Sequence, residues 1–181
     1  MLFYRGDGET KTVVRRIEDK KGLAEGLGIF FLNQRYELVD GEPDTTIEIE
    51  EDKCHFTFEL IKYFYDSSLQ AERDRVFAYF DQRDVICEMF PNMFLGLRMA
   101  KLGLRVVLNT YGNNDVSEII KKNIARNMID DKNVNILSCD TLNFLKTCLG
   151  HTFGDSKDCV RHIYINLFLE DLSFLSIFSE F

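Results

Sequence analysis

The second half of the chain alternates short apolar segments with segments of helical periodicity, and this order restricts the fold more than any other feature of the sequence. The apolar segments are predicted to be strands and cover residues 85–90, 105–108, 134–137 and 162–167. The helical segments cover residues 67–80, 95–102, 114–124, 141–149 and 172–178. Strands that alternate with helices form a parallel sheet with right-handed crossovers. The predicted fold class is therefore α/β, with a parallel, doubly wound, Rossmann-like sheet.

Short polar residues stand where two of these helices are expected to begin. Ser67 and Ser68 are predicted to cap the first helix, and Asn114 or Asp115 is predicted to cap the third. The side-chain oxygen of such a residue accepts a hydrogen bond from an N–H group that the first turn of a helix leaves free. These residues therefore define the expected helix starts.

The first part of the chain has the periodicity of strands. Residues 46–50 and 54–60 alternate apolar with polar side chains, and residues 40–43 read Asp-Gly-Glu-Pro, a strong turn signal. We therefore predict a small antiparallel β subdomain over residues 27–66, placed before the parallel sheet.

Acidic residues are concentrated in this subdomain, where seven lie between Asp40 and Asp52. Their alternation with apolar residues predicts a solvated face of the small sheet rather than a metal site. Residues 1–26 are charged and weakly patterned, so we expect this segment to be partly disordered. The parallel sheet and its helices occupy residues 67–181.

The charge balance restricts the partners of the chain. Lys and Arg number 22 and Asp and Glu 30, which gives a net charge of −8. A domain that binds phosphate backbones by itself usually presents a basic face and has a high pI. The chain is therefore expected to bind nucleic acid through a local patch or with help from another polypeptide.

The cysteines and the hydrophobic segments indicate a reducing compartment. The five cysteines are odd in number and form no C-x-x-C pair, which predicts reduced thiols and no zinc site. No apolar run approaches the roughly 20 residues that span a bilayer, and the N-terminus turns polar after four residues. We expect a cytoplasmic protein without a membrane partner, with the nucleus and the mitochondrial matrix as alternatives.

Four stretches, in order along the chain, resemble motifs of the tRNA (guanine-N1)-methyltransferases, which modify the guanosine 3′ of the anticodon, at position 37. The main signature is found in residues 55–60, 62–65 and 69–75, and the other motifs in residues 36–43, 138–145 and 163–167. The match extends from residue 28 to residue 178. The chain is thereby identified as a divergent and truncated relative of the archaeal and eukaryotic type.

The resemblance implies S-adenosyl-L-methionine-dependent methyl transfer to guanine N1. N1 carries a proton, so the reaction needs a base near it and a donor to O6. The family's proposed base matches Glu72, for which the alternative is a surface helix glutamate. Its asparagine between cofactor and base matches Asn166, for which the alternative is a turn residue at a strand end.

The resemblance also implies a set of cofactor-binding residues. Arg73 stands beside the cofactor in the family pattern, or is a solvated helix cation. Asp140, followed by Thr141, matches a carboxylate near the adenine, and can also cap its helix. Thr110 and Tyr111 stand where the family has the acidic residue that holds the ribose hydroxyls, and no metal is implied.

The cofactor motif departs from the family pattern D-x-F-A-G-x-G. Residues 88–94 read Glu-Met-Phe-Pro-Asn-Met-Phe, so both glycines are replaced by larger residues and Phe94 would intrude on the methionine and ribose positions. Thr110 lacks the carboxylate, and a lost charged hydrogen bond weakens binding by roughly 1.5–3 kcal/mol. S-adenosyl-L-methionine is therefore expected to bind weakly or not at all.

The chain also lacks parts of the family architecture. By comparison with the family pattern, we expect these 181 residues to lack the domain that reads the tRNA elbow and the strands that follow the fourth parallel strand. We expect tRNA binding to need a further domain or a partner chain, and a protein partner to cover the exposed sheet edge over residues 162–168. Two functions remain open: a diverged methyltransferase, or a noncatalytic binding module that has lost the cofactor site.

Overall fold

The computed structural model describes residues 12–17, 35–41, 46–59, 63, 65, 67–89, 93–110, 114–150 and 162–164. The chain divides into two compact units, Met1–Ser67 and Ser68–Phe181, and each unit is described by itself.

The N-terminal unit contains two separate antiparallel pairs of strands. β1 (Thr12–Ile17) pairs with β2 (Arg35–Gly41), and β3 (Thr46–Glu51) pairs with β4 (Cys54–Glu59). β3 and β4 confirm the predicted alternation, whereas β1 was not expected, because it lies within residues 1–26, the segment predicted to be partly disordered. The predicted single sheet is wrong, because the four described strands form two sheets. The predicted turn begins too early, since β2 continues to Gly41.

The hairpin of β3 and β4 buries one face. Ile47, Phe56 and Phe58 are buried, and the Phe58 ring lies 5.6–5.8 Å from the rings of Tyr63 and Tyr65. The acidic residues of β3 are exposed as predicted, except Glu51, which is 1% exposed. This packing gives the hairpin an apolar cluster of its own.

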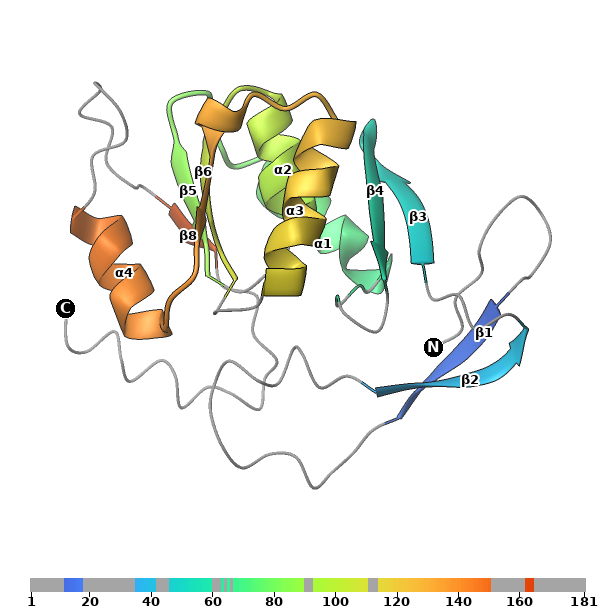
Figure 1. Cartoon of the computed structure of the whole chain (residues 1–181). Coiled ribbons are helices and arrows are strands. Elements are labelled where there is room, and N and C mark those ends of the chain that lie inside the picture. Colours follow the sequence, from blue (N-terminus) through green and yellow to red (C-terminus); the bar gives the residue numbers. More distant parts are fainter. Residues whose placement is uncertain are drawn as a thin grey trace. The chain divides into compact units, whose positions relative to one another are not determined.

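The C-terminal unit is an α/β sheet with helices on both faces. Its strands are β5 (Val85–Glu88), β6 (Arg105–Asn109), β7 (Val134–Leu137) and β8 (His162–Tyr164), all parallel, in the order β7-β6-β5-β8. Its helices are α1 (Gln70–Phe77), α2 (Met93–Lys101), α3 (Asn114–Arg126) and α4 (Thr141–Gly150). Figure 1 shows α1, α2 and α3 on one face of the sheet and α4 on the other. The predicted doubly wound sheet is confirmed.

The start of α1 differs from the prediction. Ser67 and Ser68 lie in a 3-10 turn, and the residue that precedes α1 is Leu69, whose side chain makes no capping hydrogen bond. The helix is continuous with this turn, and α1 begins at Gln70, after the two serines. The predicted helix over residues 172–178 lies outside the described residues.

Gly96 allows α2 to lie close against the sheet. A Cβ atom on Gly96 would come within 2.6 Å of a Glu88 carboxylate oxygen, 2.7 Å of the Leu108 side chain and 3.0 Å of Val106. No side chain fits this space, so glycine is required here for close packing rather than for its backbone freedom. The first turn of α2 therefore lies directly over the ends of β5 and β6.

Candidate functional site

The carboxyl ends of β5 and β8 lie side by side at the same end of the parallel sheet. The chain leaves β5 toward β6 and later returns to the other side of β5 as β8, which makes this the topological switch point of the sheet. Ligands of doubly wound sheets bind at such a point. Beyond the strands, the Met89 N–H donates a hydrogen bond to the Tyr164 carbonyl, 3.1 Å away, and so holds the two strand ends together.

Glu88, the last residue of β5, is fully buried at this point. Its Oε2 accepts a hydrogen bond from the Gly96 N–H at 3.2 Å, and its Oε1 accepts none from the described residues. Burial raises the pKa of the Glu88 carboxyl well above its usual value, although the Gly96 amide and the Arg73 charge oppose the shift. Glu88 therefore offers a buried carboxyl oxygen that has no hydrogen-bond donor within the described part of the chain.

Arg73, on α1, lies against the first turn of α2. Its side chain is 2% exposed, and its guanidinium carbon lies 5.4 Å from the centre of the Phe94 ring. Its charge also acts on Glu88. The alternative of a solvated helix cation is therefore wrong for Arg73. Phe94 is itself 1% exposed, so this cation–π pair belongs to the core.

The pKa of Tyr164, the last residue of β8, is affected by the groups described above. Burial and the charge of Glu88 raise the pKa of Tyr164 to about 12. Glu72 adds to this shift, while Arg73 and Arg75 oppose it. Ionisable groups of α1 and β5 therefore affect the pKa of Tyr164 at the end of β8.

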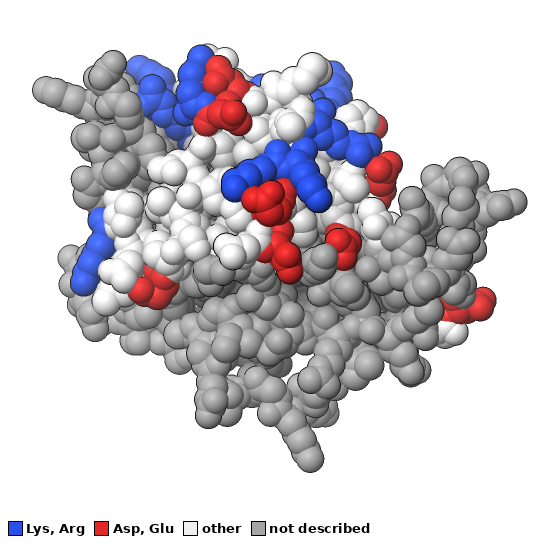
Figure 2. Space-filling view, in the orientation of Figure 1, with Lys and Arg blue, Asp and Glu red and all other residues white. Residues whose placement is uncertain are grey.

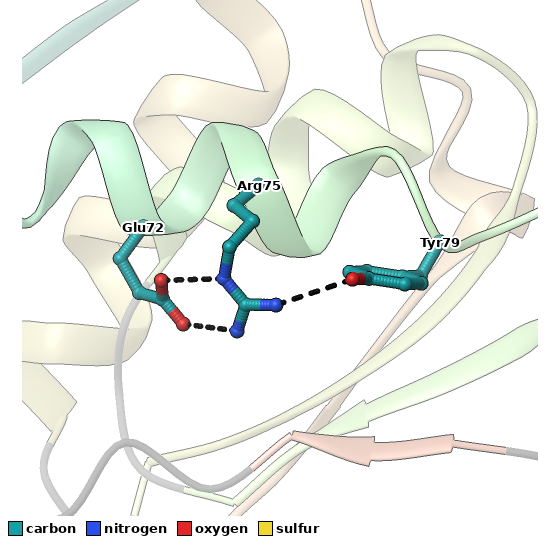
Figure 3. Close-up of polar contacts among 3 residues, drawn as sticks. All are labelled: Glu72, Arg75 and Tyr79. Atoms are coloured by element: carbon teal, nitrogen blue, oxygen red, sulfur yellow. Dashed lines mark hydrogen bonds and ion pairs between the residues drawn. The ribbon is translucent and has the colours of Figure 1, made fainter.

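Glu72, in the first turn of α1, forms an ion pair with Arg75 (Figure 3). Arg75 Nε donates to one Glu72 carboxylate oxygen at 2.7 Å, and Nη2 donates to the other at 2.6 Å. The remaining nitrogen, Nη1, donates to the Tyr79 hydroxyl at 3.4 Å, and the guanidinium lies 5.6 Å from the centre of the Tyr79 ring. The hydrogen bonds from Arg75 lower the pKa of Glu72. In this state Glu72 is a weak base.

Thr110 and Asp140 are both engaged within the protein. The Thr110 hydroxyl donates to the Leu137 carbonyl at 3.2 Å, and Thr110 is buried. Asp140 accepts a hydrogen bond from the Asn143 N–H at 3.0 Å, and this bond, more than any other contact, lowers the pKa of Asp140. Asp140 therefore caps α4, which was one of its two predicted roles.

Three predicted site residues cannot be placed by their side chains. Tyr111 and Asn166 lie outside the described residues, and Asn166 follows Tyr164 by two positions. Thr141 begins α4, but its side chain is not described.

Sequence reasoning missed Arg75 and Tyr164 as members of this site, and it placed Glu88 in the cofactor motif without giving it a role. The three-residue spacing of Glu72 and Arg75 on a helix could have predicted their ion pair. The position of Glu88 at the end of a continuous apolar strand could have predicted its burial. Tyr164 carries no local signal, because its neighbours come from α1 and β5.

The described residues do not favour thiol or metal chemistry. A hydrogen bond with the Cys148 side chain and burial raise the pKa of Cys87, and burial raises the pKa of Cys139, so both favour the thiol over the nucleophilic thiolate. Within the described ranges, no group of three or more His, Cys, Asp or Glu side chains is arranged to hold a metal ion.

The surface charges of the described residues are mixed. Figure 2 shows acidic and basic side chains side by side on the face in view. Tyr79, beside Arg75, is 70% exposed. None of the helices in the described part of the chain has both the length and the apolar character needed to cross a bilayer.

No protein-family model matches the chain. Among curated proteins, it is 26% identical over 173 residues to a tRNA (guanine(37)-N(1))-methyltransferase of Dictyostelium discoideum, covering 95% of this chain and 35% of that protein. It is 30% identical over 131 residues to the Coprinopsis cinerea protein of the same name, covering 72% of this chain and 27% of that protein. The chain thus spans about a third or less of the length of these relatives.

Solved structures show the same relationship. A complex of aTrm5 with tRNALeu is 25% identical, with a TM-score of 0.58, and the match covers 71% of this chain and 36% of that one. Trm5b from Pyrococcus abyssi has a TM-score of 0.63 at 20% identity, and the match covers 94% of this chain and 46% of that one. TYW2 from M. jannaschii, in complex with AdoMet, has a TM-score of 0.58 at 19% identity, and the match covers 81% of this chain and 62% of that one. The last two matches establish the fold.

Proposed function

Because the chain is a relative of the tRNA (guanine(37)-N(1))-methyltransferases over most of its length, we propose that it carries the core of an S-adenosyl-L-methionine-dependent enzyme that methylates N1 of the guanine 3′ of the anticodon. One observation supports this more than any other. Glu88 of β5 is buried at the switch point, where a doubly wound sheet binds its ligand, and its Oε1 accepts no hydrogen bond from the described residues.

The proposed base is Glu72. N1 of guanine must lose its proton as the methyl group arrives, and a carboxylate within hydrogen-bond reach can accept it. Glu72 lies on an exposed face of α1, so a nucleobase can approach it. Asn166 is the proposed partner of the base edge, because an amide can both donate and accept a hydrogen bond.

S-adenosyl-L-methionine supplies, when bound, a methyl group on a positively charged sulfur. The described residues fit such a cofactor through Glu88, whose free Oε1 can accept a hydrogen bond from a ligand donor. The proposed cofactor residues are Arg73, Thr110, Tyr111, Asp140, Thr141 and Asn166. Thr110 is the weakest of them, because its hydroxyl already donates to Leu137. We expect the cofactor to bind more weakly than is usual for such enzymes.

The proposed substrate is tRNA, bound with help from a further domain or a partner chain. The relatives are about three times as long as the matched segment, and the net charge of −8 disfavours unaided binding of a polyanion. An edge strand such as β8 is the proposed place for a protein partner. We place this activity in the cytoplasm, with the nucleus and the mitochondrial matrix as further candidates.

A noncatalytic binding module is not the favoured alternative. The similarity extends along the same segment of several proteins that are named as methyltransferases, and it includes the helix that carries Glu72. The substituted cofactor motif is the feature that would support a noncatalytic role. Calorimetric titration of S-adenosyl-L-methionine tests whether these substitutions weaken cofactor binding.

The test is single-turnover methylation of a tRNA transcript with guanosine at position 37, together with calorimetric titration of S-adenosyl-L-methionine. Glu72→Gln keeps the shape and removes the base, and should lower the rate by on the order of 10²-fold, as should Asn166→Ala. Glu118→Gln is the matched control, because Glu118 forms an exposed pair with Lys121 at the same spacing on α3. Activity that Glu72→Gln and Asn166→Ala leave unchanged would contradict these roles.

A further inference from the structure

We propose that Arg75 is a positioning residue whose guanidinium holds the Glu72 carboxylate in the free protein and moves to a backbone phosphate when single-stranded RNA binds. The exchange would leave Glu72 free to act on guanine. This inference rests on the proposed function, because it takes Glu72 as the base and RNA as the partner.

The geometry shows that Glu72 is occupied in the free protein. Both of its carboxylate oxygens accept hydrogen bonds from Arg75, at 2.6 and 2.7 Å. A base that already accepts two charged hydrogen bonds has less affinity for a further proton. Methylation therefore needs a state in which this ion pair is broken.

The ion pair lies where an exchange can occur. The side chains of Arg75 and Glu72 are 56% and 50% exposed, so water and solutes reach both partners. Exposed ion pairs contribute little to stability, and a phosphate presents oxygens with the same spacing as a carboxylate to the guanidinium fork. A phosphodiester can therefore replace Glu72 without any rearrangement of the core.

Tyr79 makes this site suited to RNA in particular. Its ring is 70% exposed and lies 5.6 Å from the Arg75 guanidinium carbon. Single-stranded nucleic acids bind where a cation for the backbone stands beside an aromatic ring on which a base can stack. Arg75 and Tyr79 together provide both elements on one helix and the turn after it.

Arg73 offers a contrast on the same helix. It is two residues from Arg75, but it is buried against Phe94 and acts on Glu88. It therefore cannot exchange its partner without opening the core. Arg75 is the arginine of α1 that can respond to a ligand.

Glu72 also affects the pKa of Tyr164, so the groups that act on Tyr164 are part of any pH test. Tyr164 of β8 is affected by Glu72, Arg75, Arg73 and Glu88, which come from α1 and β5. Variants are therefore compared with the same buried groups in place, and only Arg75 or a distant control residue is changed.

The first experiment measures the ionisation of Glu72 in the full chain by NMR of glutamate carboxyl carbons, assigned with Glu72→Gln. Arg75→Gln should raise the pKa of Glu72. Lys121→Gln removes the same charge from the corresponding pair on α3 and should leave the pKa of Glu72 unchanged. Adding a single-stranded RNA heptamer should raise the pKa of Glu72 more in the wild-type chain than in Arg75→Gln. A peptide nucleic acid of the same sequence, which has no phosphates, should not raise the pKa of Glu72.

The second experiment follows the Arg75 Nε signal and the affinity for the same heptamer at low salt. RNA should shift that signal, and Arg75→Gln should weaken binding about tenfold. It should also reduce the slope of log affinity against log salt by about 0.7, as expected for one phosphate contact on a single strand. Lys121→Gln should change neither quantity to this extent.

The third experiment is the pH dependence of methylation. The profile of kcat/KM reports the free protein and that of kcat reports the RNA complex. Arg75→Gln should move the acid limb of kcat/KM to higher pH, because it raises the pKa of Glu72 in the free chain. The acid limb of kcat should stay in place, since the RNA has already removed Arg75 in that state.

Some outcomes would overturn the proposal. These are a Glu72 pKa that is equal in wild type and Arg75→Gln, an Arg75 signal that millimolar RNA leaves unmoved, or acid limbs of kcat and kcat/KM that move together. If no tRNA is methylated but both binding experiments give the expected results, the proposed function fails and the ion-pair exchange is retained. If Glu72→Gln abolishes methylation while Arg75→Gln changes no pKa, the function is retained and the exchange fails.

Discussion

The exposed face of α1 and the buried end of β5 each carry a glutamate on which an arginine acts. The pKa values of these two glutamates are displaced in opposite directions. On α1, Arg75 contacts Glu72 and an exposed aromatic ring, and the pKa of Glu72 is lowered. At the end of β5, burial raises the pKa of Glu88, although the charge of Arg73 opposes the shift. Two carboxyls with pKa values displaced in opposite directions can serve different roles in one protein. Here solvent access, rather than residue type, decides which of the two can change partners.

The largest expected difference between the two regions concerns their aromatic rings. Phe94→Ala should lower the free energy of unfolding by about 3–5 kcal/mol, because the ring is fully buried beneath Arg73. Tyr79→Ala should change it by less than about 0.5 kcal/mol, because that ring is mostly exposed. Urea titration measures both. Equal losses would show that the two arginine–aromatic pairs do not differ in burial.

Gly96→Ala should be the next largest perturbation of the buried region. The added methyl group would lie within 2.7 Å of Glu88 and Leu108, and overpacking of this kind lowers the free energy of unfolding by about 1–3 kcal/mol. Urea titration in a double-mutant cycle with Leu108→Ala is the check. The loss should be smaller when Leu108 is shortened. A purely additive result would mean that the contact with Leu108 does not carry the effect.

Glu88→Gln should change how stability depends on pH. The folded pKa of Glu88 is raised, so its contribution is present below the unfolded pKa and is lost as the pH rises toward the folded pKa. Glu88→Gln removes this loss. The variant should gain stability relative to wild type as the pH rises above about 4.3, by at most about 1.4 kcal/mol per pH unit. Parallel urea titrations at several pH values test this. If the difference in the free energy of unfolding between Glu88→Gln and wild type does not change with pH, the raised pKa of Glu88 is contradicted.

Glu72→Gln should give the smallest effect and the opposite sign. The folded pKa of Glu72 is lowered, so its contribution is present above the unfolded pKa and is lost as the pH falls through the folded pKa. The variant should therefore be slightly less stable than wild type near neutral pH and equal to it in acid. The same titrations measure this. If the stability of Glu72→Gln relative to wild type rose with pH, as expected for Glu88→Gln, the two glutamates would not differ in the direction of their pKa shifts.

The sequence predicted the parallel sheet well because its signals are local. The strand over residues 134–137 matches β7 (Val134–Leu137) in full, since an apolar segment between two helices needs no knowledge of its neighbours. β1 was missed, because its strand partner, not its own charged sequence, stabilises it. Tertiary pairing of this kind leaves no periodic signal.

The candidate site was predicted only in part, for related reasons. Glu72 lies on a helix, as the predicted segment 67–80 implies, and its pair with Arg75 could have been found from helical spacing alone. The burial of Arg73 depends on the position of α2, and the pKa of Tyr164 depends on α1 and β5. Such properties arise from segments far apart in the chain, so they become visible only in the folded structure.

The position of β8 beside β5 has a consequence for how the chain folds during synthesis. β5 is a central strand, yet one of its two neighbours is the last described strand to be made. Until His162–Tyr164 leaves the ribosome, the apolar strand Val85–Glu88 has one side without its native partner. The long separation between these strands slows their pairing, and an unpaired apolar edge can recruit other chains. Nascent chains that pause before residue 162 should therefore depend on chaperones more than the finished chain does.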